Sequence, residues 1–207
     1  PGVSKRTVVV DATACVGGST LSFSKSFETV YAIEVDESRH GMLVHNCNLL
    51  SKRVAMGTVH TRHGDCLQVV PKIAKKLHST AAAGSSSSSA SSAATNGKRA
   101  AAATASSSSG FVIFLDPPWG GRAYKATPQV TSSSLSLSGK PLPQVMATFL
   151  ALPGCICCVC RVPKQYDLAA LHQASGSATP RVLSLPGNNG VCVMLLSKRL
   201  ATTTTTE

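Results

Sequence analysis

Acidic and aromatic residues are scarce in this sequence. Nine Asp and Glu stand against twenty Lys and Arg, which leaves a formal net charge of +11, and only 4% of the 207 residues are aromatic, with a single Trp among them. This excess of positive charge favours a polyanionic partner, most simply nucleic acid, because neutralised phosphates release counterions. The positive residues are scattered along the chain, so a merely basic protein stays the alternative.

Long apolar runs and targeting signals are also missing. No apolar run approaches the roughly 18 residues that a membrane-spanning helix needs, and the amino terminus lacks the pattern of a secretory signal. With 43% hydrophobic residues, the chain fits a single domain over residues 1–207 with a substantial core. We therefore expect a protein without a membrane partner.

A four-thiolate zinc site needs its cysteines to converge on one point, usually through a C-x₂-C turn, and the cysteine-rich run of this chain lacks such a turn. Cys155, Cys157, Cys158 and Cys160 lie within GCICCVCRV, which is typical of a buried strand. Simple alternation places Cys155 and Cys157 on one face of this strand and Cys158 and Cys160 on the other. We expect small buried hydrophobic side chains in a reducing compartment, and no bound metal.

The stretch FVIFLDPPWGGRAY, residues 111–124, is the most informative part of the chain. Its opening apolar run is too short for an independent helix and is typical of a buried strand. The two prolines forbid both a helix and a strand ladder, so the backbone must leave the sheet at Asp116. Ligands bind at this carboxyl edge in open α/β sheets. Asp116 can accept N–H bonds from a planar group on which Trp119 stacks, although a Pro-Pro turn with a core Trp is the alternative.

Further acids follow the first two predicted strands. Residues 7–11, TVVVD, form a strand that ends in Asp11 and precedes the Gly-containing loop ATACVGGST. A second strand, TVYAIEVD, lies about 20 residues after this loop, which is the spacing of a nucleotide-binding βαβ unit. Glu34 is our first choice for a ribose contact. Asp36 is the second choice, or the cap of the helix that follows.

A third predicted strand, residues 58–63, precedes Asp65. This acid can accept a hydrogen bond from an adenine amino group, cap the helix predicted over 67–77, or do both.

The second half continues the alternation of helices and strands. We expect a helix over 141–152, a strand over 155–162, a helix over 165–174, and strands over 180–185 and 191–197. The turn PGNNG between the last two strands favours an antiparallel hairpin. Arg161 and Lys164 end the Cys-rich strand at the ligand edge, where their charges can meet phosphate.

Three segments are predicted to be flexible. Residues 79–110 are almost entirely Ala and Ser without periodic large apolar residues, which indicates a flexible insertion. Residues 125–140 are rich in Ser and Thr and predict a second flexible loop, beside the site. Residues 201–207 predict a disordered tail.

These features together resemble the class I S-adenosylmethionine-dependent methyltransferases. They are more closely similar to the trimethylguanosine synthase family, which adds two methyl groups to the exocyclic N2 of a 7-methylguanosine RNA cap. The resemblance is carried by VVVDATACVGGST, VYAIEVD, GDCL and above all DPPWGGRAY. It implies an α/β fold: a three-layer, Rossmann-like class I methyltransferase with a seven-stranded, mostly parallel sheet and an antiparallel last strand.

The resemblance also implies roles for the strand-end residues. The cofactor, S-adenosyl-L-methionine, is expected to contact Asp11, Thr13, Gly17, Glu34, Asp36, Asp65 and Cys66. Asp11 and the loop around Gly17 would hold the methionine part, Glu34 the ribose and Asp65 the adenine.

Catalysis is expected at Asp116, Pro117 and Trp119. Asp116 and Pro117 would receive the guanine N2 amino group, and Trp119 would stack on the positively charged 7-methylguanine. The cap phosphates would meet Arg122, Arg161 and Lys164.

The sequence departs from the family pattern at Cys15, where family members usually have an additional glycine. Family members also build the cap pocket with residues upstream of the first strand, and this chain begins almost at that strand. We expect a chain without such residues to keep the fold but to bind cofactor or cap poorly.

The resulting hypothesis is a monomeric RNA cap guanosine-N2 methyltransferase in the nucleus, with the cytoplasm as a further location. The alternatives are a ribosomal or transfer RNA guanine-N2 or adenine-N6 methyltransferase and a non-catalytic RNA-binding module on a degenerate methyltransferase fold.

Overall fold

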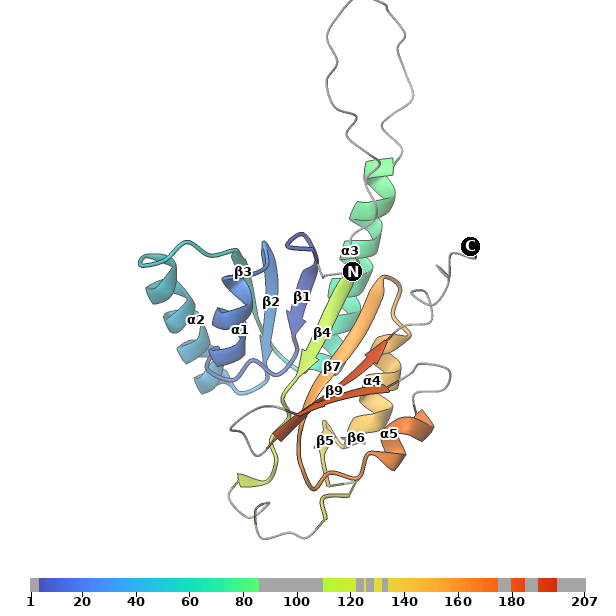
Figure 1. Cartoon of the computed structure of the whole chain (residues 1–207). Helices are drawn as coiled ribbons and strands as arrows, with labels where there is room; N and C mark the ends of the chain where they lie inside the picture. The colour runs from blue at the N-terminus through green and yellow to red at the C-terminus, as the bar shows by residue number, and fades with distance from the viewer. Residues whose placement is uncertain are drawn as a thin grey trace, which may run out of the picture.

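Five parallel strands form the body of one sheet (Figure 1). The structure, a computed structural model, describes residues 4–85, 110–121, 125, 129–131, 134–174, 180–184 and 190–196. The parallel strands are β1 (Val8–Asp11), β2 (Thr29–Glu34), β3 (Thr58–His63), β4 (Phe111–Leu115) and β7 (Cys155–Pro163). They establish the predicted α/β, Rossmann-like fold.

Two more strands continue the sheet beyond β7. β9 (Gly190–Leu196) pairs antiparallel with β7, and β8 (Pro180–Ser184) pairs antiparallel with β9, so the sheet order is β3-β2-β1-β4-β7-β9-β8. The chain runs outward from β1 to β3 on one side and from β4 on the other. The carboxyl ends of β1 and β4 therefore flank a topological switch point, which is where ligands bind in this class of sheet.

Helices cover both faces of the sheet, so the domain has three layers with the sheet in the middle (Figure 1). α1 (Gly18–Ser24) and α2 (Glu37–Ser51) pack on one face, where Leu43 and Cys47 meet Ala32 of β2. α3 (Cys66–Ser85) and α4 (Leu142–Leu150) pack on the other face. This second face holds the larger core, which includes alternate residues of β4 that are almost fully buried. α5 (Ala169–Ala174) lies against α4.

The Cys-rich strand does not follow simple alternation. The pairing of β4 with β7 passes from Phe111–Cys155 to Val112–Cys157, so Ile156 is an extra residue in a β-bulge. A bulge shifts the alternation by one residue. Cys155, Cys158 and Cys160 consequently share the core on the α3–α4 side, and the predicted grouping of Cys155 with Cys157 is wrong.

Burial raises the pKa of the thiols of Cys155 and Cys157 to about 12 and about 11. These thiols therefore stay protonated and apolar. No group of three His, Cys, Asp or Glu side chains within the described residues is placed to hold a metal ion.

The second half of the segment predicted to be a flexible loop, residues 125–140, forms a regular element in the structure. Ser136–Leu137 (β5) and Lys140–Pro141 (β6) pair as an antiparallel hairpin. Ser138 and Gly139 form its two-residue turn with φ values of 50° and 76°, and two positive φ angles in succession are typical of a type I′ turn. Leu135, which precedes the hairpin, is 1% exposed and anchors the segment in the core.

Two helices also differ from their predicted limits. α3 continues to Ser85 rather than ending at Leu77, because the added segment includes three consecutive alanines, the best helix formers. α5 begins at Ala169 rather than 165, since the carboxylate of Asp167 accepts the backbone N–H of Ala169 and starts the helix there. The rest of the predicted insertion, residues 86–109, and the tail, 201–207, lie outside the described residues.

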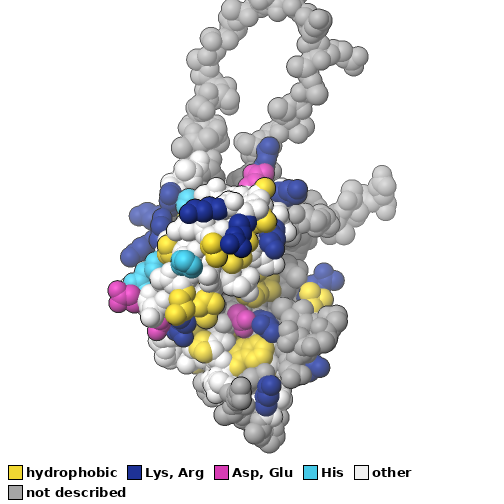
Figure 2. All heavy atoms as spheres, turned by 90° about the vertical axis from the view of Figure 1, so that its left-hand side faces the viewer, with side chains coloured by type: hydrophobic (Ala, Val, Ile, Leu, Met, Phe, Trp, Pro, Cys, Tyr) yellow, Lys and Arg dark blue, Asp and Glu magenta, His cyan; other side chains and the backbone are white. Residues whose placement is uncertain are grey.

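Basic side chains gather on the face formed by α2 and β3 (Figure 2). Its exposed Lys and Arg are Arg39, Lys52 and Arg53 on or next to α2 and Arg62 on β3. None of the described helices is long and apolar enough to cross a membrane.

Candidate active site

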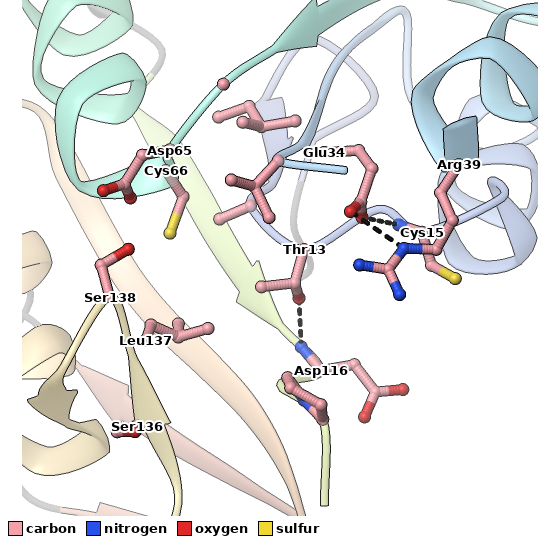
Figure 3. A pocket seen from close by; sticks show the side chains of 15 residues that line it. Thr13, Cys15, Glu34, Arg39, Asp65, Cys66, Asp116, Ser136, Leu137 and Ser138 are labelled. Carbon is pink, nitrogen blue, oxygen red and sulfur yellow. Dashed lines mark hydrogen bonds and ion pairs between the residues drawn. The ribbon is translucent and has the colours of Figure 1, made fainter. Parts of the chain in front are cut away.

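Acidic residues at the ends of several strands line one cavity at the carboxyl edge of the sheet (Figure 3). This cavity, the acidic cavity, has a volume of about 330 Å³, which is within the usual range for small-molecule sites. Its polar lining includes Thr13, Cys15, Glu34, Arg39, Asp65, Asp116 and Ser138, and its apolar lining includes Ile33, Pro118 and Leu137.

Glu34, at the end of β2, is only 6% exposed and accepts three hydrogen bonds. Its Oε2 accepts from the backbone N–H of Cys15 at 2.8 Å. Its Oε1 accepts from the backbone N–H of Asp36 at 2.9 Å and from Nε of Arg39 at 3.2 Å. A carboxylate has about four lone-pair positions, so roughly one remains for a ribose hydroxyl.

Asp36 and Asp65 both act at the starts of helices. Asp36 is the N-cap of α2 and accepts the backbone N–H of Arg39 at 2.8 Å. Asp65 Oδ1 accepts the backbone N–H of Leu67 at 2.8 Å at the start of α3. Asp65 and Cys66 also line the acidic cavity, whereas Asp36 lies outside its lining. Asp65 therefore combines a cap with a place at the cavity wall, and Asp36 has the role of a cap.

A second cavity, the tryptophan cavity, opens beside the first and has a volume of about 620 Å³. Pro117, Trp119 and Arg161 line it, and Thr13, Cys15, Asp116 and Pro118 line both cavities. Thr13 Oγ1 accepts the backbone N–H of Asp116 at 2.7 Å and ties the loop after β1 to the turn after β4. The two cavities meet at Asp116, so ligands held in each of them would approach one another there.

Asp11 is buried behind this meeting point. The residue is 1% exposed, and its Oδ2 accepts a hydrogen bond of 2.6 Å from Thr20 Oγ1 on α1. Burial raises the pKa of this carboxyl from 3.8 to about 6, against the opposing effects of Thr20 and the backbone amide of Thr13. Asp11 lines neither of the two cavities. Its observed contact joins β1 to α1.

The loop between β1 and α1 contains two residues with left-handed backbone. Cys15 has φ 50°, a conformation that glycine adopts readily and other residues adopt at some cost. Cys15 thus takes the backbone conformation expected of the glycine that the family has here, and its exposed side chain lines both cavities. Gly17 has φ 100°, and a Cβ at this position would lie 2.9 Å from Leu43 Cδ1. Gly17 is required by helix packing and lines neither cavity.

Trp119, Arg161 and Asp116 form a cluster in the tryptophan cavity. The Trp119 Nε1–H donates to the backbone oxygen of Arg161 at 3.3 Å, and the Arg161 guanidinium carbon lies 5.2 Å from the centre of the indole ring. Arg161 Nη1 also donates to Asp116 Oδ2 at 3.1 Å. Burial raises the pKa of Asp116, and the charge of Arg161 opposes that effect.

The other residues predicted to contact the substrate differ in their distance from the tryptophan cavity. Pro117 lines the tryptophan cavity with Trp119. Lys164 is exposed in the turn after β7 and lines neither cavity, and Arg122 lies outside the described residues. The structure therefore brings Asp116, Pro117, Trp119 and Arg161 together and leaves Lys164 apart.

Comparison with protein families gives the family of this chain. The sequence model of the RNA cap guanine-N2 methyltransferases matches residues 6–189, which is most of the chain. The chain belongs to this family. It is therefore a member of a family of S-adenosylmethionine-dependent RNA methyltransferases, as the sequence predicts, and RNA is the implied substrate. A comparison with curated protein sequences gives no match.

Comparison with solved structures gives matches of low sequence identity, and the first of them shares the fold of this chain. A protein from Porphyromonas gingivalis W83, described as a methyltransferase, superposes with a TM-score of 0.57 at 16% identity; the match covers 95% of this chain and 38% of that one. An rRNA methylase from Streptococcus thermophilus gives a TM-score of 0.48 at 14% identity over 94% and 89% of the two chains. An RNA methyltransferase from Salinibacter ruber, in complex with S-adenosyl-L-homocysteine, gives 0.49 at 12% over 95% and 84%.

The acidic cavity suits the cofactor of this methyltransferase family. Ile33 and Leu137 supply apolar surface, and Glu34 and Asp65 supply acceptors at the ends of neighbouring strands. These acceptors match the hydroxyl and amino donors of an adenosine, and the carboxylates favour the positive charge of a sulfonium. The residues present thus fit S-adenosylmethionine.

Two parts of the site are not anticipated from the sequence. Arg39 reaches Glu34 from α2, and the hairpin residues Leu137 and Ser138 close the acidic cavity from the far side. The alternation LSLSG before Lys140 is a hairpin signal that could have identified the second of these. No pattern in the sequence near Arg39 predicts its contact with Glu34, because that contact depends on the direction in which α2 leaves β2.

Proposed function

We propose that this protein methylates the exocyclic N2 of guanosine in an RNA cap and converts a 7-methylguanosine cap to the trimethylguanosine form. The observation that carries the proposal is the meeting of the two cavities at Asp116, with Trp119 on the side away from the acidic cavity. Family membership supports the reaction type and the guanine N2 target.

The acidic cavity holds the cofactor in this proposal. S-adenosylmethionine, when bound, supplies the methyl group. Glu34 accepts from the ribose and Asp65 from the adenine amino group, while Thr13 keeps the turn at Asp116 in place. The protein thereby aligns the two reactants, and such positioning is a large part of catalysis in bimolecular transfers.

The tryptophan cavity holds the target base. Trp119 offers an aromatic face that attracts the positive charge of 7-methylguanine more strongly than a neutral base. Asp116 and the backbone carbonyl of Pro117 are the acceptors for the N2 amino group. Hydrogen bonds from this group fix its orientation toward the acidic cavity.

Methyl transfer to short caps tests the proposal. Labelled S-adenosylmethionine is incubated with a 7-methylguanosine dinucleotide cap, or with uncapped RNA, and the label in each product is measured. We expect label on N2 of the cap. Label on uncapped RNA alone would replace the cap assignment by the ribosomal or transfer RNA alternative, and cofactor binding without any transfer would favour the non-catalytic one.

Trp119→Ala is expected to weaken 7-methylguanosine binding by about 1–3 kcal/mol, the range for stacking of a base on an aromatic side chain. Trp119→Phe, which keeps an aromatic face, should lose less. Equal affinity of all three proteins for 7-methylguanosine would reject the role of Trp119.

The monomeric state and the nuclear location stay predictions, which size-exclusion chromatography and imaging of a tagged protein would check.

A further inference from the structure

The side chain of Arg161 already makes the two contacts that the proposed function assigns to the target base. Its guanidinium is a planar cation over the Trp119 ring, with Cζ 5.2 Å from the ring centre. It also donates an N–H to Asp116 Oδ2 at 3.1 Å. A 7-methylguanine is likewise a planar cation, with an N–H donor on its edge. Arg161 and the base therefore compete for one aromatic face and one carboxylate.

The side chain of Arg161 is only partly buried. The side chains of Arg161 and Asp116 are 29% and 28% exposed, so neither is locked in the core. The Nε of Arg161 is buried and makes no hydrogen bond with any described residue, and an unpaired buried donor has a free-energy cost. The backbone of Arg161 is held within β7 and accepts from Trp119 Nε1. The guanidinium can therefore leave while the indole stays in place.

A displaced guanidinium needs a new anionic partner. The base takes over both the ring face and Asp116, and a cap carries phosphates directly attached to the nucleoside. Arginine binds phosphate with paired, charge-assisted hydrogen bonds. A nucleoside without phosphates offers the guanidinium no such partner. When such a nucleoside displaces Arg161, the contacts that the guanidinium loses with Trp119 and Asp116 are therefore not replaced.

We propose that Arg161 is a specificity-determining residue that makes base binding depend on the phosphates of the cap. With no substrate, its side chain occupies the base position on Trp119 and Asp116. With a cap, the base replaces the guanidinium, which moves to the phosphates. This proposal rests on the proposed function, because it takes the tryptophan cavity to be the site of the base.

The test uses the fluorescence of Trp119, which is the only Trp in the chain and so reports on this site alone. Quenching by 7-methylguanosine and by 7-methylguanosine triphosphate is titrated with the wild type and with Arg161→Met, a variant that keeps an unbranched side chain without the charge. We expect the variant to bind 7-methylguanosine about twofold to thirtyfold more tightly, the range that corresponds to one cation–π contact. The advantage of the triphosphate over the nucleoside should shrink at the same time.

Arg181→Met is the matched control, since Arg181 is an exposed arginine on β8 that lines neither cavity. It should leave the ratio of the two affinities unchanged. If Arg161→Met weakens both ligands in parallel, or leaves their ratio at the wild-type value, the role of Arg161 is overturned while the proposed function stands. If neither ligand quenches Trp119 in any of the three proteins, the proposed function fails, and the role of Arg161 fails with it.

Discussion

The buried carboxyl of Asp11 joins the end of β1 to α1 through a single short hydrogen bond to Thr20. Its pKa of about 6 lies above the value of 3.8 for an unperturbed carboxyl, because burial disfavours the charged form. The folded protein consequently binds this proton more tightly than the unfolded chain does. Between these two pH values the folded state loses stability as the pH rises.

Asp11→Asn should therefore change the pH dependence of stability. The asparagine has no proton to lose, so the free energy of unfolding of the variant, relative to wild type, should rise between about pH 4 and pH 6. The pKa values give an upper bound of about 3 kcal/mol for this change. Urea unfolding at several pH values measures it. A pH-independent difference between the two proteins would contradict the raised pKa.

Glu34 serves the fold as well as the cavity. Glu34→Ala would leave the backbone N–H groups of Cys15 and Asp36 without their acceptor, and the half-exposed guanidinium of Arg39 would keep only its ion pair with Asp36. We expect a loss of about 1–3 kcal/mol in stability, the cost of leaving partly buried backbone donors unpaired, together with weaker cofactor binding. Thermal unfolding and calorimetric titration with S-adenosylmethionine measure the two effects. Glu34→Gln keeps one carbonyl oxygen and should lose less stability; an unchanged melting temperature in both variants would show that these bonds contribute nothing.

The β5–β6 hairpin is present in the structure but was not predicted from the composition of the sequence. Its Ser and Thr content predicts a flexible loop, but Leu137 lines the acidic cavity and Leu135 is buried. A short hairpin is unstable alone and depends on packing against the rest of the domain. Packing of this segment against the core therefore stabilises the hairpin, and the hairpin forms part of the wall of the acidic cavity.

Gly139→Ala tests whether the turn of this hairpin matters for the cavity. Gly139 has φ 76° and open space around it, so an alanine adds backbone strain without a clash. We expect a stability loss of about 1 kcal/mol and weaker cofactor binding. Gly41→Ala is the matched control, because Gly41 lies within α2 with no atom near its Cβ position and should gain up to about 1 kcal/mol. The same sign for both variants would argue against strain as the cause.

For the molecule as a whole, we expect the positive charge on exposed residues to contribute to RNA binding outside the two cavities. The formal charge is +11, and exposed Lys and Arg gather on the α2–β3 face (Figure 2). Contacts of such residues with phosphates release counterions, so affinity falls linearly with salt concentration on logarithmic axes.

We expect a steeper slope for a capped RNA of about 20 nucleotides than for the cap dinucleotide, because the longer ligand reaches more of these residues. Fluorescence anisotropy over a series of salt concentrations measures both slopes. Equal slopes would confine the electrostatic contribution to the cap site. Arg53→Gln, on the α2–β3 face, should lower the slope for the long RNA only.

Local sequence patterns were sufficient to predict the parallel α/β order and the acids at the strand ends. Local patterns carry these features, because an apolar run followed by an acid or two prolines shows where a strand ends, and parallel strands end at the same edge. The resemblance carried by DPPWGGRAY also identified the family, and the family model confirms it.

Which of those groups face a cavity and which hold the fold together depends on contacts that form only in the folded chain. The bulge at Ile156 placed Cys155 on the same face as Cys158 and Cys160, and Asp36 caps α2. Arg161, whose predicted phosphate contact stays a prediction, lies over Trp119 and pairs with Asp116. Residues 45 positions apart in the sequence become partners only when β4 and β7 pair, so no local pattern contains that contact.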